Sequence, residues 1–430
     1  MSAATHFHDP AVAAADPAVG RISWRTPVLM AAVTIAGLLA FGLFTSAGRE
    51  SRFNLGGGGI PFDPPPLVLP SRLTVLVLVA IALTLTALAY WYTSTRRTVP
   101  LAIPISFGVV MLAAFLTWAV AGNARGLTLS FLLATTITAT LPFAFGAMAG
   151  VLCERSGIIN IAIEGQLLMG AFMAAIVASM AGNFYYALIA APIGGALVGL
   201  LLAVFSIRYR VDQIIVGVVL NVLVLGVTTY LLHSVVRDNS STMNDPPRLT
   251  PIRIPLLADI PVVGPALFNH NVIVYAMFAT VIGLQFMIFR SRWGLRMRSV
   301  GEHPKAADTV GINVNRTRYR NVVFGSAVAG FGGAALVSAG LAFLENITAG
   351  RGYIALAAMI LGRWKPAGAL AAALLFGFAD SLNRMLVNIS SPVPTELLAM
   401  LPYLATIFAV AGLVGRVRPP AAEGKPYPPS

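Results

Sequence analysis

The sequence is poor in charge, cysteine and histidine. Asp, Glu, Lys and Arg make up only 10% of the 430 residues, whereas a soluble domain carries about 25%. With 57% hydrophobic residues and a mean hydropathy of +0.81, no water-soluble fold can cover the apolar surface. The single cysteine, Cys153, excludes an internal disulfide and a multi-cysteine metal site. We therefore expect no redox chemistry, metal or cofactor.

Motifs of common enzymes are missing as well. The sequence has no GxxxxGK(S/T) phosphate-binding loop, so this chain does not hydrolyse ATP in the usual way. It also lacks HExxH, GxSxG and any cluster of His and Cys. We expect no enzyme, and any ATP hydrolysis to occur on a separate subunit. A self-sufficient secondary carrier is a remote alternative, because the apolar runs lack the chain of carboxylates and histidines used in proton coupling.

Long apolar runs dominate what is present. A membrane-spanning helix needs about 20 apolar residues, and ten runs qualify. We predict an all-α, polytopic transmembrane helical bundle of about 10–12 membrane segments, some of them short or broken. The stretch 353–379, interrupted at 362–366, is expected to form two short helices that either span or re-enter the membrane. The ten runs are 28–46, 73–93, 100–121, 128–152, 158–182, 185–207, 213–232, 272–289, 321–343 and 396–415.

The basic residues indicate topology. The net charge is +13, but Lys and Arg lie in short links between apolar runs, which does not favour nucleic-acid binding. With the N-terminus in the cytoplasm, 20 of the 29 Lys and Arg residues fall inside, in accordance with the positive-inside rule. We therefore predict cytoplasmic tails at 1–27 and 416–430, three N-terminal spans with an outer Gly/Pro-rich loop at 28–127, and a core at 128–415 with a basic cytoplasmic link at 290–320.

Within this link, residues 301–312 read GEHPKAADTVGI. Pro304 suits the first position of a helix and Gly311 suits its end, which predicts a helix of about two turns. Its small apolar surface and its charged residues are suited to docking in a groove on a soluble protein. An ordinary interfacial helix between two spans fits the spacing equally well.

A second stretch, ERSGIINIAIEGQ at 154–166, carries polar groups into an apolar run. Asn160 and Glu164 are four residues apart, so we expect them on one helix face. A carboxylate within a span must face protein or a water-filled path. Glu164, Asn160 and Asn221 of the run 213–232 are therefore candidates for lining a path. The alternative is that Glu164 braces a broken helix and Asn221 joins helices by hydrogen bonds.

Four ordered segments resemble a known family. They are GVLCERSGIINIAIEGQLLMGAF at 150–172, VDQIIVGVVLNVLVLG at 211–226, GLRMRSVGEHPKAADTVGINV at 294–314, and ENITAGRGYIALAAMILGRWKPAGALAAALLFGFAD at 345–380. With their spacing they cover about 128–415 and are similar to permease subunits of bacterial ABC importers for branched-chain amino acids, ribose and nucleosides. The nucleoside branch is the most similar.

The resemblance implies a permease in the bacterial inner membrane, bounded by lipid, which forms part of the path of an ATP-driven importer, with nucleosides as the first substrate class. Simple sugars and branched-chain amino acids are the alternative substrates. The implied partners are a cytoplasmic ABC ATPase, a second permease that is a related chain, and an extracytoplasmic substrate-binding protein. The three N-terminal spans depart from the family pattern. The residues expected to couple to the ATPase are Gly301, Glu302, Pro304, Lys305, Ala306, Ala307, Asp308 and Gly311.

Overall fold

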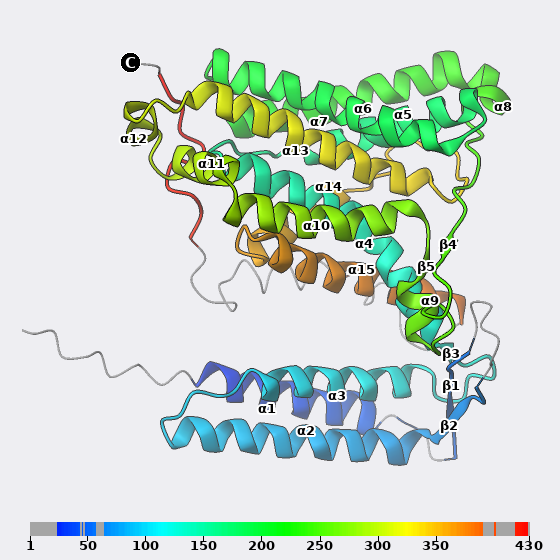
Figure 1. The fold of residues 1–430 in the computed structure, drawn as a ribbon. Helices are drawn as coiled ribbons and strands as arrows, with labels where there is room; N and C mark the ends of the chain where they lie inside the picture. Colours follow the sequence, from blue (N-terminus) through cyan, green and yellow to red (C-terminus); the bar gives the residue numbers. More distant parts are fainter. Residues whose placement is uncertain are drawn as a thin grey trace, which may run out of the picture. The chain divides into compact units, whose positions relative to one another are not determined.

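The computed structural model describes residues 24–43, 45, 48–56, 64–389, 400 and 418–428. These residues divide between two compact units (Figure 1). The first unit comprises residues 1–52 and 68–126, and the second comprises 53–67 and 127–430. The second unit contains the candidate site.

The first unit is built from α1 (Arg25–Gly37) with its π-helical continuation (Leu38–Gly42), α2 (Ser71–Ser94) and α3 (Ala102–Ala119). These helices are apolar almost throughout, and their small core includes Met30, Ala82 and Phe107. Strands β1 (Glu50–Asn54) and β2 (Leu67–Pro70) link α1 to α2.

The second unit is predominantly helical. Strand β3 (Leu127–Thr128) leads into it and pairs in parallel with the end of β1. A further short pair, β4 (Ile252–Arg253) and β5 (Asn269–His270), is antiparallel. The helices are α4 (Leu129–Glu154), α5 (Ile163–Ala181), α6 (Ala187–Ala203), α7 (Gln213–Leu231), α8 (Ser240–Met243), α9 (Val263–Leu267), α10 (Val272–Arg290), α11 (Arg292–Glu302), α12 (Pro304–Thr309), α13 (Val314–Val337), α14 (Arg351–Leu361) and α15 (Pro366–Asn388).

Polar side chains cap several of these helices. Asp212 accepts hydrogen bonds from the backbone N–H groups of Ile214 and Ile215, at 2.9 and 3.1 Å, and so begins α7. Asn271, Ser291 and Asn313 cap α10, α11 and α13 in the same way. Each side chain satisfies a backbone donor that the first turn of a helix leaves without a partner.

Ten helices among the described residues are long and apolar enough to cross a membrane. This finding confirms the predicted polytopic helical architecture. Nine of the ten predicted runs overlap these helices, while the tenth, 396–415, lies outside the described residues except for residue 400.

The prediction of two short helices within 353–379 is wrong for the second of them. Helix α14 has 11 residues, but α15 has 23 and is long enough to span. The apolar face of α15 continues beyond 379 with the buried Leu382, Met385 and Leu386. Asp380 and Arg384 form an ion pair one turn apart on the same helix. The pairing lowers the cost of carrying two charges on this helix.

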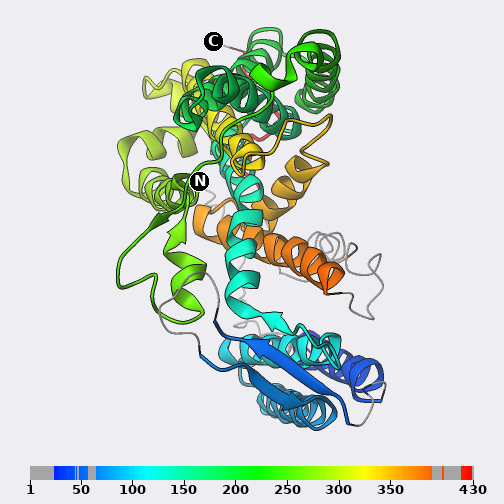
Figure 2. The ribbon, with the colours of Figure 1, turned by 90° about the vertical axis from the view of Figure 1, so that its right-hand side faces the viewer.

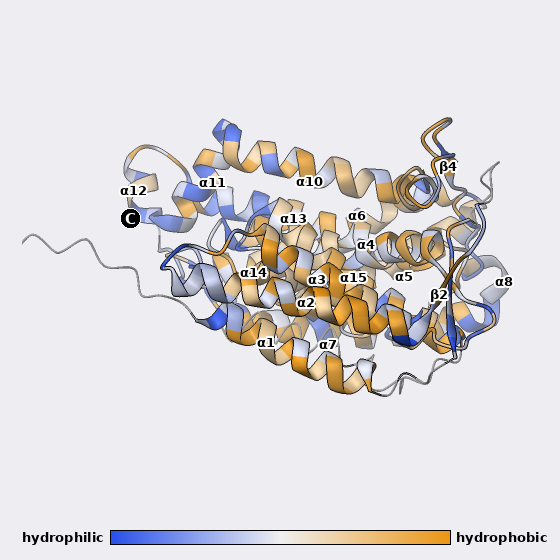
Figure 3. Ribbon diagram, turned by 90° about the horizontal axis from the view of Figure 1, so that it is seen from below, coloured by the Kyte–Doolittle hydropathy of each residue, from blue (hydrophilic) through white to orange (hydrophobic). Residues whose placement is uncertain are grey.

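Helices α4 and α13 form the centre of the second unit. Figure 2 shows α4, in cyan, passing through the middle of this unit. In the 18-residue apolar window of α4, 89% of the residues are buried. Helix α13 packs closely on α5 and α6 through small residues, among them Gly170, Gly195 and Gly330. Hydrophilic residues gather at α11 and α12, at one end of the unit (Figure 3).

Candidate functional site

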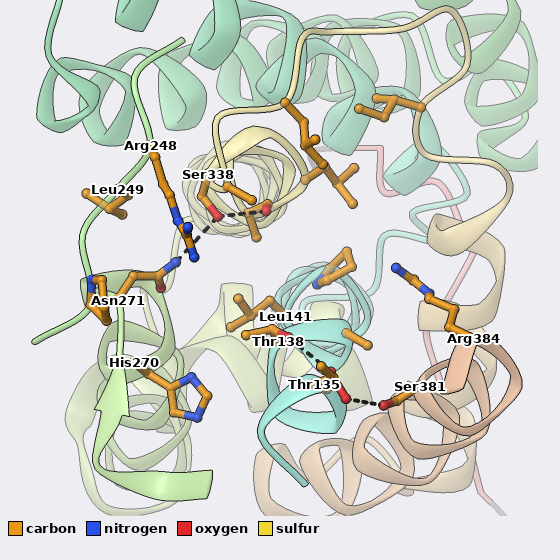
Figure 4. A pocket seen from close by; sticks show the side chains of 18 of the residues that line it. Thr135, Thr138, Leu141, Arg248, Leu249, His270, Asn271, Ser338, Ser381 and Arg384 are labelled. Atoms are coloured by element: carbon orange, nitrogen blue, oxygen red, sulfur yellow. Dashed lines mark hydrogen bonds between the residues drawn. The ribbon is translucent and has the colours of Figure 1, made fainter. Parts of the chain in front are cut away.

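A cavity of about 790 Å³ opens at the end of the second unit that carries α9. Its walls come from α4, α13, α15 and the segments 248–251 and 269–271 (Figure 4). Sites for small molecules typically measure about 300–1,000 Å³. Several lining side chains carry hydroxyl or amide groups, and the Thr135 and Ser381 hydroxyls lie 2.5 Å apart. The cavity is therefore large and polar enough to admit a small polar solute.

The charged groups of this cavity are cationic. Arg248, Arg351 and Arg384 line it, whereas none of the described lining residues is Asp or Glu. Burial lowers the pKa of His270 from its usual value, which keeps this ring neutral at pH 7. Asp380 pairs with Arg384, whereas no described lining residue supplies a carboxylate to Arg248. The lining therefore offers hydrogen-bond donors and favours neutral or acceptor-rich solutes over cationic ones.

The long link between α7 and α10 forms one wall of the cavity. Asn244 clamps the loop after α13, because its amide exchanges two hydrogen bonds with the backbone of Phe343, at 2.7 and 3.0 Å. The backbone N–H of Leu249 donates to the carbonyl of Ser338 over 2.9 Å. These contacts fix the position of Arg248, which points into the cavity in Figure 4.

Glu164 holds the beginning of the short helix α14. Its two carboxylate oxygens accept hydrogen bonds from the backbone N–H groups of Gly350 and Gly352, over 2.7 and 2.6 Å. Glu164 is only 8% exposed, and it also lies in the first turn of α5. The carboxylate thus lies at the positive ends of two helices, which stabilises a negative charge in this buried place.

Asn221 joins the same region from α7. Its side-chain oxygen accepts a hydrogen bond from the N–H of Gly165 over 2.8 Å. Its amide nitrogen donates to the carbonyl of Ile161 over 2.9 Å and to the hydroxyl of Tyr353 over 3.2 Å. The structure therefore brings Asn221 and Glu164 together around the first turns of α5 and α14.

The prediction that Asn160 and Glu164 share a helix face is wrong. Helix α5 begins at Ile163, so Asn160 lies in the break before it. Its amide forms a reciprocal pair with that of Gln166, at 3.0 and 3.1 Å, and is completely buried. The non-helical stretch after the Ser-Gly pair is therefore longer than the spacing predicts. Within it, the hydrogen bonds between Asn160 and Gln166 satisfy both side-chain amides without a helix.

Glu154 holds the other end of α14, a role that the sequence analysis did not predict. Its carboxylate accepts a hydrogen bond from the indole N–H of Trp364 over 2.5 Å. The Nε–H of Arg155 donates to the carbonyl of Trp364 over 3.0 Å. Arg363 and Trp364 both have positive φ, at 56° and 51°, a conformation that persists only where surrounding contacts enforce it.

The carboxylates Glu154 and Glu164 thus fasten the two ends of α14 to the α4–α5 segment. Short helices that end within a membrane protein, with fixed side-chain partners, are typical of transporter cores. None of Asn160, Glu164 and Asn221 is among the residues that line the 790 Å³ cavity. Arg351, between the two glycines that Glu164 holds, does line it, so the position of α14 affects the shape of the cavity.

Helix α12 begins at Pro304 and is followed by Gly311 with φ of 81°, as the sequence predicts. Ala307 faces inward with 2% exposure, whereas Val310 is 74% exposed. Gly301 is buried against the backbone, since a Cβ there would lie 2.2 Å from the carbonyl oxygen of Arg155. Glu302, Lys305 and Ala306 are exposed. The role of this surface in docking remains a prediction.

Apolar spanning helices around a donor-lined cavity, with a broken helix at its edge, define a multi-pass membrane transport protein. The chain belongs to the family described as the permease component of the branched-chain amino acid transport system, which matches residues 132–410. A permease component takes part in transport and is not an enzyme. Helices α1–α3 precede the matched region.

Curated relatives agree with this assignment. The guanosine ABC transporter permease protein NupQ of Bacillus subtilis is 38% identical over 312 residues, covering 70% of this chain and 97% of that protein. The nucleoside ABC transporter permease protein NupC of Lactococcus lactis is 34% identical, again over 70% and 97%. A putative glucose ABC transporter permease protein of Haloferax volcanii is 30% identical over 66% and 92%. No solved structure matches the chain.

Proposed function

We propose that this chain forms part of the transmembrane path of an ATP-driven ABC importer for nucleosides. The observation that carries this proposal is its 38% and 34% identity to a guanosine and a nucleoside permease, each over 97% of the relative. We infer that a separate cytoplasmic ATPase hydrolyses ATP, that an extracytoplasmic protein delivers the nucleoside, and that a second, related permease completes the path.

The chemistry of the cavity supports a nucleoside. A nucleoside is neutral, and its hydroxyls and base edges present acceptors to the donors that Arg248 and Asn271 provide. A branched-chain amino acid carries an ammonium group, which these lining residues do not neutralise with a carboxylate. A simple sugar has hydroxyls alone and fits the same donors, and the glucose permease relative makes it the second candidate.

The proposed mechanism is alternating access. In the orientation that the basic residues favour, α11 and α12 lie at the cytoplasmic end and the cavity opens at the extracytoplasmic end. ATP binding closes the ATPase pair and displaces the end of α11 together with α12, at Glu302, Pro304 and Asp308 among others. This displacement reorients the spans around the cavity, where Glu164 and Asn221 keep α14 in place. The released nucleoside then leaves toward the cytoplasm.

Uptake in cells tests the proposal. In cells that lack the native gene but retain the ATPase and the binding protein, we expect this chain to restore uptake of labelled guanosine and not of leucine. Ala342 is exposed and lines the cavity, so Ala342→Trp places an indole group against it, obstructs it and is expected to reduce uptake at least tenfold.

The matched control is Ile282→Trp, at a 70% exposed position on α10 outside the cavity lining, and it is expected to retain uptake. Restored uptake of glucose in place of guanosine contradicts the assignment to nucleosides. Full uptake by Ala342→Trp at normal protein levels contradicts the assignment of the cavity.

A further inference from the structure

The C-terminal segment 418–428 lies against α11. The backbone N–H of Ala422 donates to the carbonyl of Gly301 over 2.9 Å. The N–H of Ala421 donates to the Glu302 carboxylate over 3.2 Å. Ala422 is only 4% exposed. Both partners on α11, Gly301 and Glu302, belong to the stretch 301–312 that the sequence predicts to couple to the ATPase.

Tyr427 fastens the same segment to α12. Its hydroxyl donates to the Asp308 carboxylate over 2.6 Å, and its side chain belongs to a small core with Val300, Ala307 and Val314. Ala307 faces inward from α12 into this core, with 2% exposure. Helix α12 has only six residues and does not hold its place by itself, so Tyr427 contributes directly to its position.

The segment also contacts the turn between α4 and α5. The N–H of Gly424 donates to the carbonyl of Gly157 over 3.2 Å, and Arg318 of α13 donates to the carbonyl of Lys425 over 2.9 Å. Gly157 has φ of 91°, and a Cβ there would lie 2.8 Å from the Arg318 guanidinium. The turn is therefore shaped to receive this segment.

Glu423 extends these contacts to the end of α14. Its carboxyl group lies against that of Glu154, which accepts the indole N–H of Trp364. Two adjacent carboxyl groups in a buried place disfavour ionisation of both at once. The same segment thus reaches α12 through Tyr427, and the Glu154–Trp364 pair at the end of α14 through Glu423.

We propose that residues 418–428 form a strap that transmits the displacement of α12 to the C-terminal end of α14, and so couples ATP hydrolysis to opening of the path. The strap makes specific contacts with α11, α12, α13 and the α4–α5 turn. This inference rests on the proposed function, because only an ATP-driven permease has a displacement of α12 to transmit.

The test compares Tyr427→Phe with wild type in membranes that contain the ATPase and the binding protein. The variant keeps the ring in its core and removes only the hydroxyl that contacts Asp308. We expect at least a threefold fall in guanosine taken up per ATP hydrolysed, with the ATPase still bound. Tyr209→Phe, at a 64% exposed position, is the matched control and keeps the wild-type ratio.

The ratio of guanosine taken up to ATP hydrolysed distinguishes a coupling role of the Tyr427 hydroxyl from a purely structural one. A purely structural role for the hydroxyl lowers the amount of assembled permease but leaves guanosine taken up per ATP unchanged, and that result overturns the strap. A chain ended after Arg418 is a second, larger perturbation, for which we expect ATP hydrolysis without uptake. Wild-type membranes that take up no guanosine at all contradict the proposed function instead, so the two failures are distinguishable.

The strap has a pH dependence that gives a further readout. Burial raises the pKa of Glu423 above its usual value, so the docked strap favours the protonated carboxyl. Docking is then strongest below the ordinary pKa and is lost as the pH rises through the raised one. The charged groups on the strap and on the elements that pack around it are Glu154, Arg155, Arg298, Glu302, Asp308, Arg318 and Lys425.

We expect guanosine uptake per ATP to fall in wild type as the pH rises through the raised pKa of Glu423, and to stay level in Glu423→Gln, which has no proton to lose at this position. Parallel pH profiles of wild type and Glu423→Gln would show that the carboxyl pair does not control the strap.

Discussion

Replacing Gly330 by leucine is expected to lower the melting temperature of the protein sharply and to reduce uptake with it. A Cβ at Gly330 would lie 2.2 Å from the carbonyl oxygen of Ala191 and 2.8 Å from the Cα of Gly195. Both neighbours are backbone atoms of α6, which do not yield as a flexible side chain does. Helix α13 also meets α5 here, because a Cβ on Gly170 would lie 2.2 Å from the carbonyl oxygen of Gly330.

The expected cost is on the order of 3 kcal/mol or more, since the overpacked side chain separates three helices at once. The measurement is the melting temperature of detergent-solubilised protein, with size-exclusion chromatography used to monitor how much folded protein remains after heating. Gly226→Leu is the matched control, because a Cβ at Gly226 on α7 meets nothing within 4 Å. Equal melting temperatures of the two variants would contradict this packing.

Replacing Glu164 by glutamine is expected to reduce guanosine uptake at least tenfold while the protein remains inserted. The carboxylate satisfies two backbone N–H groups at the start of α14. The glutamine amide has one acceptor oxygen and presents its NH₂ donor to the other N–H. The loss of one charge-assisted hydrogen bond costs on the order of 2 kcal/mol, which corresponds to about thirtyfold in the population of the correct position of α14.

Uptake is measured per inserted molecule, with binding of the ATPase followed in parallel. Glu345→Gln is the matched control, because this side chain is 55% exposed and has a 3.6 Å contact with His233, a kind of surface pair that contributes little. Normal uptake by Glu164→Gln would mean that the position of α14 does not limit transport.

The architecture was predictable because spanning helices follow from composition. A long apolar run without charge crosses a bilayer as a helix, because the helix satisfies its own backbone hydrogen bonds. Nine described spans therefore lie where the sequence predicts them. Helix α12 was predictable for a local reason, since Pro304 and Gly311 favour its two ends. In both cases the determining forces act within a few residues of the chain.

The partners of buried polar groups were not predictable, because they come from distant segments. The carboxylate of Glu164 finds its donors 186 and 188 residues away. Glu154 was part of a quoted motif, yet its contacts with Trp364 and Glu423 depend on how α14 and the C-terminal segment fold back. The length of α15 was underestimated because a charged pair within one helix looks like an interruption in the sequence.

The most direct test of the account is accumulation of labelled guanosine in liposomes that contain this chain, its partner permease and the ATPase, with the binding protein outside. The account predicts accumulation that requires ATP on the side of α12, that ceases when the ATPase is inactivated and that ion gradients do not replace. Accumulation by the chain without ATP, driven by an ion gradient, would contradict it and identify a secondary carrier.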